Sequence, residues 1–255
     1  MDHYGIWITV ALAECTLQPH IVDGIKTSIY KFPHSVFLIV DTNVTAIQCG
    51  GSIINQRIIL TAAHCLYNVR IAADITSYAG SARAQDGEEF ETLRYAIHDA
   101  FKEQTLANDI ALILLKRSLP LGAHMKRIAV YRIPPVRTFG IVAGWGLLYD
   151  NPMVDTKWLH ATRLKVWTRR ECIKVIPGIP KGTLCAGDLK NTGHASKGDS
   201  GSALVVDNFI QIGIVSFRKH SIITTLGGYT NVSYHYTWIA KTARRLYCKK
   251  KKHNK

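Results

Sequence analysis

Acidic residues are scarce in this chain: 18 Asp and Glu stand against 32 Lys and Arg, which gives a formal net charge of +14. Such an excess attracts anionic surfaces and acidic partners. The sequence nevertheless shows no basic helix and no aromatic-and-basic stripe of the kind used on RNA or DNA, so nucleic acid is not an expected partner. It also contains no CxxC pair, and a zinc site is therefore not expected. No other metal or cofactor constellation stands out.

Long hydrophobic runs are also absent. After residue 20 no stretch of 18 or more apolar residues occurs, so no membrane-spanning helix is expected. Charged residues make up only 20% of the chain and hydrophobic residues 47%. This balance excludes disorder for most of the chain and is enough to bury a large core.

The N-terminus and the cysteines favour export. Residues 6–13 form a short apolar run that ends in Ala11-Leu12-Ala13, the small-residue pattern of a signal peptidase site. Residues 1–13 are therefore interpreted as a signal peptide, although Lys and Arg are missing before the run; a truncated or misassigned N-terminus is the alternative. An even count of widely spaced cysteines fits disulfides in an oxidising compartment. They are Cys15, Cys49, Cys65, Cys172, Cys185 and Cys248.

The pattern from residue 21 onward predicts an all-β sandwich or barrel. Short β-branched segments alternate with turn residues, as expected for this class. Examples are Ser35–Val40, Arg57–Ala62, Asp109–Leu115, Gly140–Ala143, Ala203–Val206 and Phe209–Val215. The segment 234–246 predicts an amphipathic helix with Trp238 and Ile239 facing inward. Residues 247–255 then form a basic tail.

Three segments carry residues suited to nucleophilic catalysis. His64 follows an apolar strand, Asp109 opens another, and Ser200 lies in a Gly-rich turn before a third. A hydroxyl is a poor nucleophile until an imidazole takes its proton and a carboxylate fixes the imidazole tautomer. A glycine at position 198 lets the backbone N–H groups of Gly198 and Ser200 point together, which would stabilise an oxyanion.

The order of these segments and further motifs resemble the trypsin/chymotrypsin family of serine endopeptidases over residues 21 to about 246. The matching motifs are IVDG at 21–24, CGGS at 49–52, TAAHC at 61–65, NDIAL at 108–112, GWG at 144–146, GDSG at 198–201, SF at 216–217 and YTNV at 229–232. The resemblance implies two six-stranded antiparallel β-barrels, an active-site cleft between them and a C-terminal helix. It implies a catalytic triad of His64, Asp109 and Ser200. It also implies the disulfides Cys49–Cys65 and Cys172–Cys185.

The activation site departs from the family pattern. By resemblance, cleavage after residue 20 would release residues 14–20 as a propeptide, and the new amine of Ile21 would pair with Asp199. The basic residue that usually precedes this cut is replaced by Pro19-His20. Cys15 and Cys248 have no partner assigned by this resemblance. Either they form a disulfide that keeps the propeptide attached, or Cys15 leaves with the signal segment and Cys248 stays free.

The specificity pocket departs from the family as well. The position that holds Asp in trypsin-like members is His194, so a preference for Arg or Lys is not expected. Ser196 replaces a cysteine, and Arg218 replaces a glycine after Ser216-Phe217. Three alternatives remain open: a cationic pocket that prefers Asp or Glu, an apolar pocket with Arg218 in solvent, and a pocket blocked by Arg218. The residues expected to bind substrate are His194, Lys197, Ser216, Phe217, Arg218 and Gly227.

Two functions from different classes follow. The first is a secreted endopeptidase that acts on protein or peptide substrates, without a cofactor, and is open to proteinaceous inhibitors. The second is a catalytically weak or inactive homologue that binds a partner. With either function, the basic tail could attach the protein to an anionic polysaccharide or lipid.

Overall fold

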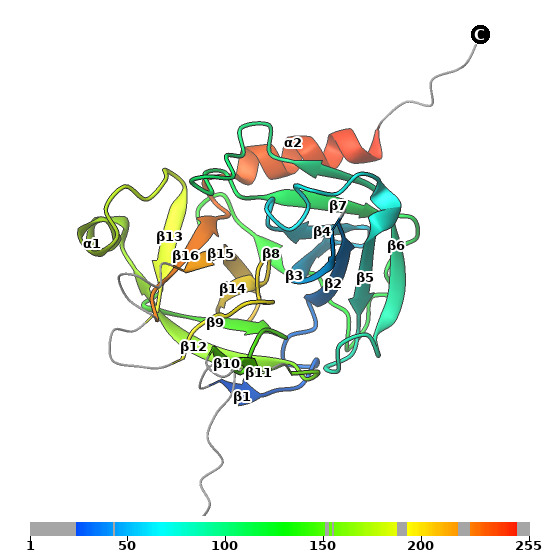
Figure 1. Cartoon of the computed structure of the whole chain (residues 1–255), viewed down its shortest axis with the longest axis horizontal. Helices are drawn as coiled ribbons and strands as arrows, with labels where there is room; N and C mark the ends of the chain where they lie inside the picture. Colours follow the sequence, from blue (N-terminus) through cyan, green and yellow to red (C-terminus); the bar gives the residue numbers. More distant parts are fainter. Residues whose placement is uncertain are drawn as a thin grey trace, which may run out of the picture.

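The computed structural model describes residues 24–42, 44–150, 153–154, 156–187, 193–218 and 225–248. Two closed six-stranded antiparallel barrels make up most of it, side by side in Figure 1. This confirms the predicted fold class. Among the described helices, none is long and apolar enough to cross a membrane.

The first barrel closes in the order β2-β3-β4-β7-β6-β5. Its interior is apolar because alternate strand residues face inward; in β5 Ile75, Ser77 and Ala79 are buried while their neighbours are not. Its strands are β2 Ser35–Asp41, β3 Ala46–Asn55, β4 Ile58–Thr61, β5 Ile75–Ala79, β6 Glu88–Ile97 and β7 Ala111–Leu115.

The second barrel is closed by the pairing of β9 with β12. Its strands are β9 Phe139–Gly144, β12 His160–Trp167, β13 Thr183–Ala186, β14 Ala203–Val206, β15 Ile210–Arg218 and β16 Gly227–Asn231. Short strands attach to it: β1 Ile25–Lys26 pairs with β12, and β8 Ala129–Val130 pairs with β15. β10 Tyr149–Asp150 and β11 Met153–Val154 form a small hairpin of their own.

Within the described ranges, two α-helices accompany the barrels, besides a 3-10 turn at Ala72–Asp74. α1, Arg169–Val175, begins at a capping box in which Thr168 and Glu171 bond to each other's backbone N–H. α2, Tyr236–Tyr247, lies at the predicted place and starts two residues later than expected. It follows the second barrel in sequence but packs on β6 and β7 of the first.

The part of the chain that the structure describes contains two disulfides, Cys49–Cys65 and Cys172–Cys185. The first joins β3 to the turn that follows β4, and the second joins α1 to β13. Cys248 is exposed and unpaired among the described residues, while Cys15 lies outside them.

Candidate active site

The pairing of β4 with β7 brings His64 and Asp109 together. Thr61, at the end of β4, is opposite Ala111, at the start of β7. The turn after β4 and the residues just before β7 therefore meet at one edge of the barrel. There His64 Nδ1 lies 2.8 Å from Asp109 Oδ2, and the backbone N–H of His64 donates to Oδ1 at 2.8 Å.

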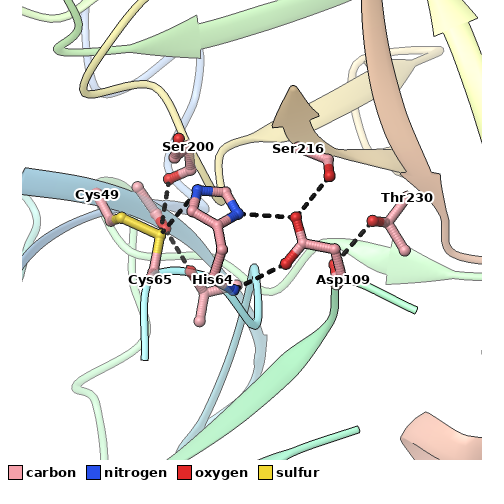
Figure 2. A network of polar contacts seen from close by, with 9 residues as sticks. Cys49, His64, Cys65, Asp109, Ser200, Ser216 and Thr230 are labelled. Atoms are coloured by element: carbon pink, nitrogen blue, oxygen red, sulfur yellow. Dashed lines mark hydrogen bonds and ion pairs between the residues drawn. A yellow bond between two sulfur atoms is a disulfide. The ribbon is translucent and has the colours of Figure 1, made fainter. Parts of the chain in front are cut away.

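Asp109 is fully buried, and the second barrel holds it in place. The Ser216 hydroxyl of β15 donates to Oδ2 at 2.5 Å, and the Thr230 hydroxyl of β16 donates to the Asp109 backbone carbonyl at 2.7 Å. Figure 2 shows both donors converging on the aspartate from the side away from His64. Because a carboxylate only accepts, the imidazole must carry its proton on Nδ1, which leaves Nε2 free to act as a base.

Ser200 lies on the other side of the imidazole ring from Asp109 (Figure 2). Its turn crosses the seam between the barrels, where the Gly50 N–H donates to the Ser200 carbonyl at 2.7 Å. Gly201 follows with φ +87°, and an added Cβ would lie 2.3 Å from the Gly50 carbonyl oxygen. Only glycine fits this close approach, so the turn positions Ser200 tightly.

The Ser200 hydroxyl makes no direct hydrogen bond to His64 among the bonds between described residues. His64 Nε2 instead lies 3.9 Å from Cys65 Sγ. Catalytic hydrogen bonds are often long or absent before substrate binds, and they tighten in the complex with substrate.

Two backbone N–H groups beside Ser200 have no acceptor among the described residues: those of Gly198 and Ser200 itself. The turn takes this shape because Gly198 has φ +96° and the next side chain, Asp199, is buried beneath the loop. The Asp199 carboxylate accepts from the backbone N–H groups of Gly146 and Ser196, each at 2.8 Å. Ile21, its expected ionic partner, lies outside the described residues.

A cavity of about 320 Å3 adjoins Ser200. All six residues expected from sequence to bind substrate line it, which are His194, Lys197, Ser216, Phe217, Arg218 and Gly227. Leu147, Met153 and Tyr229, which sequence reasoning did not single out, line it too. The described lining residues include the cations Lys197 and Arg218 and no acidic residue.

Arg218 points inward. It ends β15 opposite Gly227 of β16, and its Nη1 atom is buried. Burial raises the pKa of Tyr229, the Asp199 charge raises it further, and the Arg218 charge opposes both. The guanidinium is thus within electrostatic reach of the phenol in the cavity wall.

Sequence reasoning missed two residues that donate hydrogen bonds to Asp109. Thr230 was quoted only as part of the YTNV motif, and Ser216 was assigned only to the pocket. The Ser216 hydroxyl also bonds to the Asp109 carboxylate. No local sequence pattern could indicate this bond, because Ser216 and Asp109 are 107 positions apart.

Comparisons with known proteins agree with this fold. The family model described as Trypsin matches residues 21–239. Serine protease SP24D of Anopheles gambiae is 34% identical over 88% of this chain and 82% of its own length. Human cathepsin G is 30% identical over 88% of each chain. The solved structure of HL collagenase superposes with a TM-score of 0.78 at 26% identity, over 88% of this chain and 98% of that one.

The two barrels, the paired His64 and Asp109, and these matches together define a serine endopeptidase. Its substrates are proteins or peptides. The chain belongs to the trypsin family.

Proposed function

We propose that the chain is a secreted endopeptidase that hydrolyses peptide bonds through an acyl-enzyme formed on Ser200. The observation that carries this proposal is the buried Asp109 carboxylate held 2.8 Å from His64 Nδ1, with Ser200 across the ring. Ser200 is the nucleophile, His64 the general base and then acid, and Asp109 the group that orients the imidazole.

The reaction follows from these positions. His64 Nε2 takes the Ser200 proton as Oγ attacks the substrate carbonyl carbon. The resulting oxyanion accepts hydrogen bonds from the N–H groups of Gly198 and Ser200. The C–N bond breaks as His64 passes its proton to the leaving amine. Water then gives a proton to His64 as it attacks the ester carbonyl carbon. The C–O bond to Ser200 breaks as His64 returns this proton to Oγ, which releases the acid and restores Ser200.

Labelling with a serine-directed phosphonate tests this proposal. We expect the chain cleaved before Ile21 to be labelled once per molecule, at Ser200. Ser200→Ala should abolish labelling, while Ser118→Ala, at an exposed serine beyond the opposite end of β7 from Asp109, should label like the wild type. A folded, cleaved chain that resists the reagent would instead support the alternative, a catalytically weak or inactive homologue that binds a partner.

Activation by a new N-terminus is part of the proposal. Residues 1–13 would be the signal peptide, 14–20 the propeptide, 21–246 the peptidase domain and 247–255 the tail. The buried Asp199 carboxylate already accepts hydrogen bonds from the Ser196 N–H, in the loop that precedes Ser200, and from the Gly146 N–H after β9. A cation from the Ile21 amine would neutralise this carboxylate and fix the oxyanion turn. Mass analysis before and after reduction would show whether a Cys15–Cys248 bridge keeps the propeptide attached.

For primary specificity we propose a preference for Asp or Glu before the scissile bond. The inward Arg218, with His194 and Lys197 in the same cavity wall, would pair with the carboxylate in a charge-assisted hydrogen bond. An apolar pocket is the alternative if Arg218 turns outward when substrate binds, and a blocked pocket if it stays and fills the space.

Cleavage of a peptide library separates the three alternatives. An acidic pocket requires cleavage after Asp or Glu that Arg218→Ala weakens, with Arg169→Ala, at an exposed arginine on α1, as the matched control. Wild-type cleavage after apolar residues would support the apolar pocket. Gain of general cleavage in Arg218→Ala over an inert wild type would show that Arg218 blocks the pocket.

A further inference from the structure

The residue before Asp109 has an uncommon backbone conformation. Asn108 has φ +55°, in the left-handed region that few residues other than glycine adopt. Asparagine is among the residues that tolerate this region best, yet the conformation persists only where surrounding contacts maintain it. Those contacts therefore decide how firmly the Asp109 carboxylate is placed.

The contacts of Asn108 run to two parts of the chain. Its Nδ2 donates to the Ala100 carbonyl at 2.8 Å, and its Oδ1 lies 3.2 Å from His235 Nε2. Because a backbone carbonyl can only accept, the amide orientation is fixed, and Oδ1 must be the atom that faces the histidine.

His235 is therefore surrounded by acceptors. Its Nδ1 lies 2.9 Å from the Asn231 carbonyl oxygen, and its Nε2 faces Asn108 Oδ1. A neutral imidazole has one N–H donor, so it leaves one of these oxygens facing a lone pair. The doubly protonated ring donates to both oxygens at once.

The rings of His98 and Tyr234 lie next to His235. The His98 ring lies edge-on with its centroid at 5.5 Å, and the Tyr234 ring lies at 5.0 Å. His98 Nδ1 accepts from the Ala100 N–H at 3.1 Å, which requires that nitrogen to be unprotonated. Burial lowers the pKa of His235, and the hydrogen bond to the Asn231 backbone opposes this shift. Burial and the His235 charge lower the pKa of His98, and the Asp99 charge opposes this shift.

From this geometry we infer that His235 is a positioning residue for Asp109. It lies on the turn between β16 and α2, holds the Asn108 amide from the second barrel, and holds it best as a two-proton donor. Thr230, near the end of β16, holds the Asp109 carbonyl. The segment 230–235 thus contacts both the Asp109 backbone and the side chain of the residue before it. This inference rests on the proposed function of Asp109.

Two substitutions of similar volume test the role of the donor. His235→Gln keeps a donor that can reach Asn108 and does not titrate, whereas His235→Met removes the donor. We expect His235→Met to lower the phosphonate labelling rate of the cleaved chain by roughly three- to tenfold, the size of one lost hydrogen bond. His235→Gln should recover most of the rate, and His124→Gln, at an exposed histidine, should match the wild type.

The pH dependence is a readout that a purely structural role would not give. The deficit of His235→Met relative to the wild type should be largest at low pH. It should shrink as the pH rises through the pKa of the wild-type imidazole, which burial lowers below its ordinary value of 6.5. The ratio of the Gln to the Met variant should stay constant as the pH changes, because neither side chain titrates. Equal rates for both variants, at any pH, would overturn the inference.

A measurement independent of activity completes the test. The Ile110 N–H donates to the Asn108 carbonyl at 2.9 Å, so its hydrogen exchange reports on this turn directly. Exchange should be faster in His235→Met than in the wild type and restored in His235→Gln. If the wild type were not labelled at all, the proposed function would fail, and this exchange rate would still decide the role of His235. Unchanged exchange in His235→Met would refute it.

Discussion

At the scale of single residues, the Asp109 carboxylate has donors from both barrels. The His64 backbone and ring come from the first barrel, and the Ser216 hydroxyl from the second. A hydrogen bond to a charged group contributes more than one between neutral groups, about 1.5–3 kcal/mol. The Ser216 hydroxyl, which bonds to the charged carboxylate, should therefore contribute more free energy than the Thr230 hydroxyl, which bonds to a neutral carbonyl.

Ser216→Ala should accordingly reduce kcat/KM more than Thr230→Val does. We expect a loss of about tenfold or more for the serine and a smaller loss for the threonine, since 1.4 kcal/mol corresponds to a factor of ten. Rates measured on one ester substrate, normalised by active-site titration, would check this order. A larger loss in Thr230→Val would show that the backbone contact matters more than the charge.

His34, which is not one of the proposed site residues, supplies a pH-dependent contribution to stability. It precedes β2, is buried, and packs edge-on against Phe32 with ring centroids 6.2 Å apart. Burial lowers the pKa of His34 from 6.5 to about 4. Between these values the unfolded chain binds more protons than the folded chain, so the free energy of unfolding rises with pH and falls as the solution is acidified.

Replacing His34 by Phe should remove this dependence. The wild type should lose about 3 kcal/mol of stability at this site between pH 7 and pH 4, because each unit of pKa shift corresponds to about 1.4 kcal/mol. Urea unfolding at the two pH values would measure the difference. His124→Phe, at an exposed position, should keep the wild-type slope; the same slope in His34→Phe would contradict the assignment.

At the scale of elements, the sequence predicted best where a local pattern decides the structure. β14 has the predicted bounds, Ala203–Val206, because the strand is apolar and bounded by turn residues. α1 was not predicted, although Thr168 and Glu171 show the capping-box spacing, because seven residues give too little periodicity to recognise. The orientation of Arg218 stayed open for another reason: it depends on packing between β15 and β16, not on neighbours in sequence.

The Cys49–Cys65 disulfide connects an element to the site. Replacing both cysteines with alanine should lower the free energy of unfolding by about 3 kcal/mol, the chain-entropy value for a loop of this length. It should also slow phosphonate labelling, because the bridge fixes the turn that carries His64.

The second bridge provides the control for this prediction. Cys172→Ala with Cys185→Ala should cost similar stability, since the enclosed loops span 13 and 16 residues. Its labelling rate should stay near the wild-type value, because α1 and β13 carry no member of the triad. Equal slowing in both double variants would show that general destabilisation, and not local positioning, is responsible.

At the scale of the whole molecule, positive charge is concentrated at the C-terminal end. Lys241, Arg244 and Arg245 are exposed on α2, and none of them forms an ion pair among the described residues. The helix contains no acidic residue and leads toward four lysines at 249–252. We propose that this end of the molecule attaches to an anionic polysaccharide or lipid.

Retention on a sulfated polysaccharide resin would check the attachment. Neutralising Lys241, Arg244 and Arg245 together, or removing residues 249–255, should lower the salt concentration needed for elution. The matched control neutralises three exposed cations elsewhere, Lys31, Lys102 and Arg132. Because salt screens exposed charges within about 10 Å, a local patch predicts a small effect in this control. Equal effects would mean that only net charge matters.

The seam between the barrels has a practical consequence. A polypeptide cut in the linker at 131–138 would separate His64 and Asp109, on the first half, from Ser200, Ser216 and Thr230 on the second. Each half would keep all six strands of its own barrel, yet neither would hold a complete set of reacting and supporting groups. Recovered hydrolysis after mixing the halves would therefore report their reassembly, and the enzyme could serve as its own split reporter.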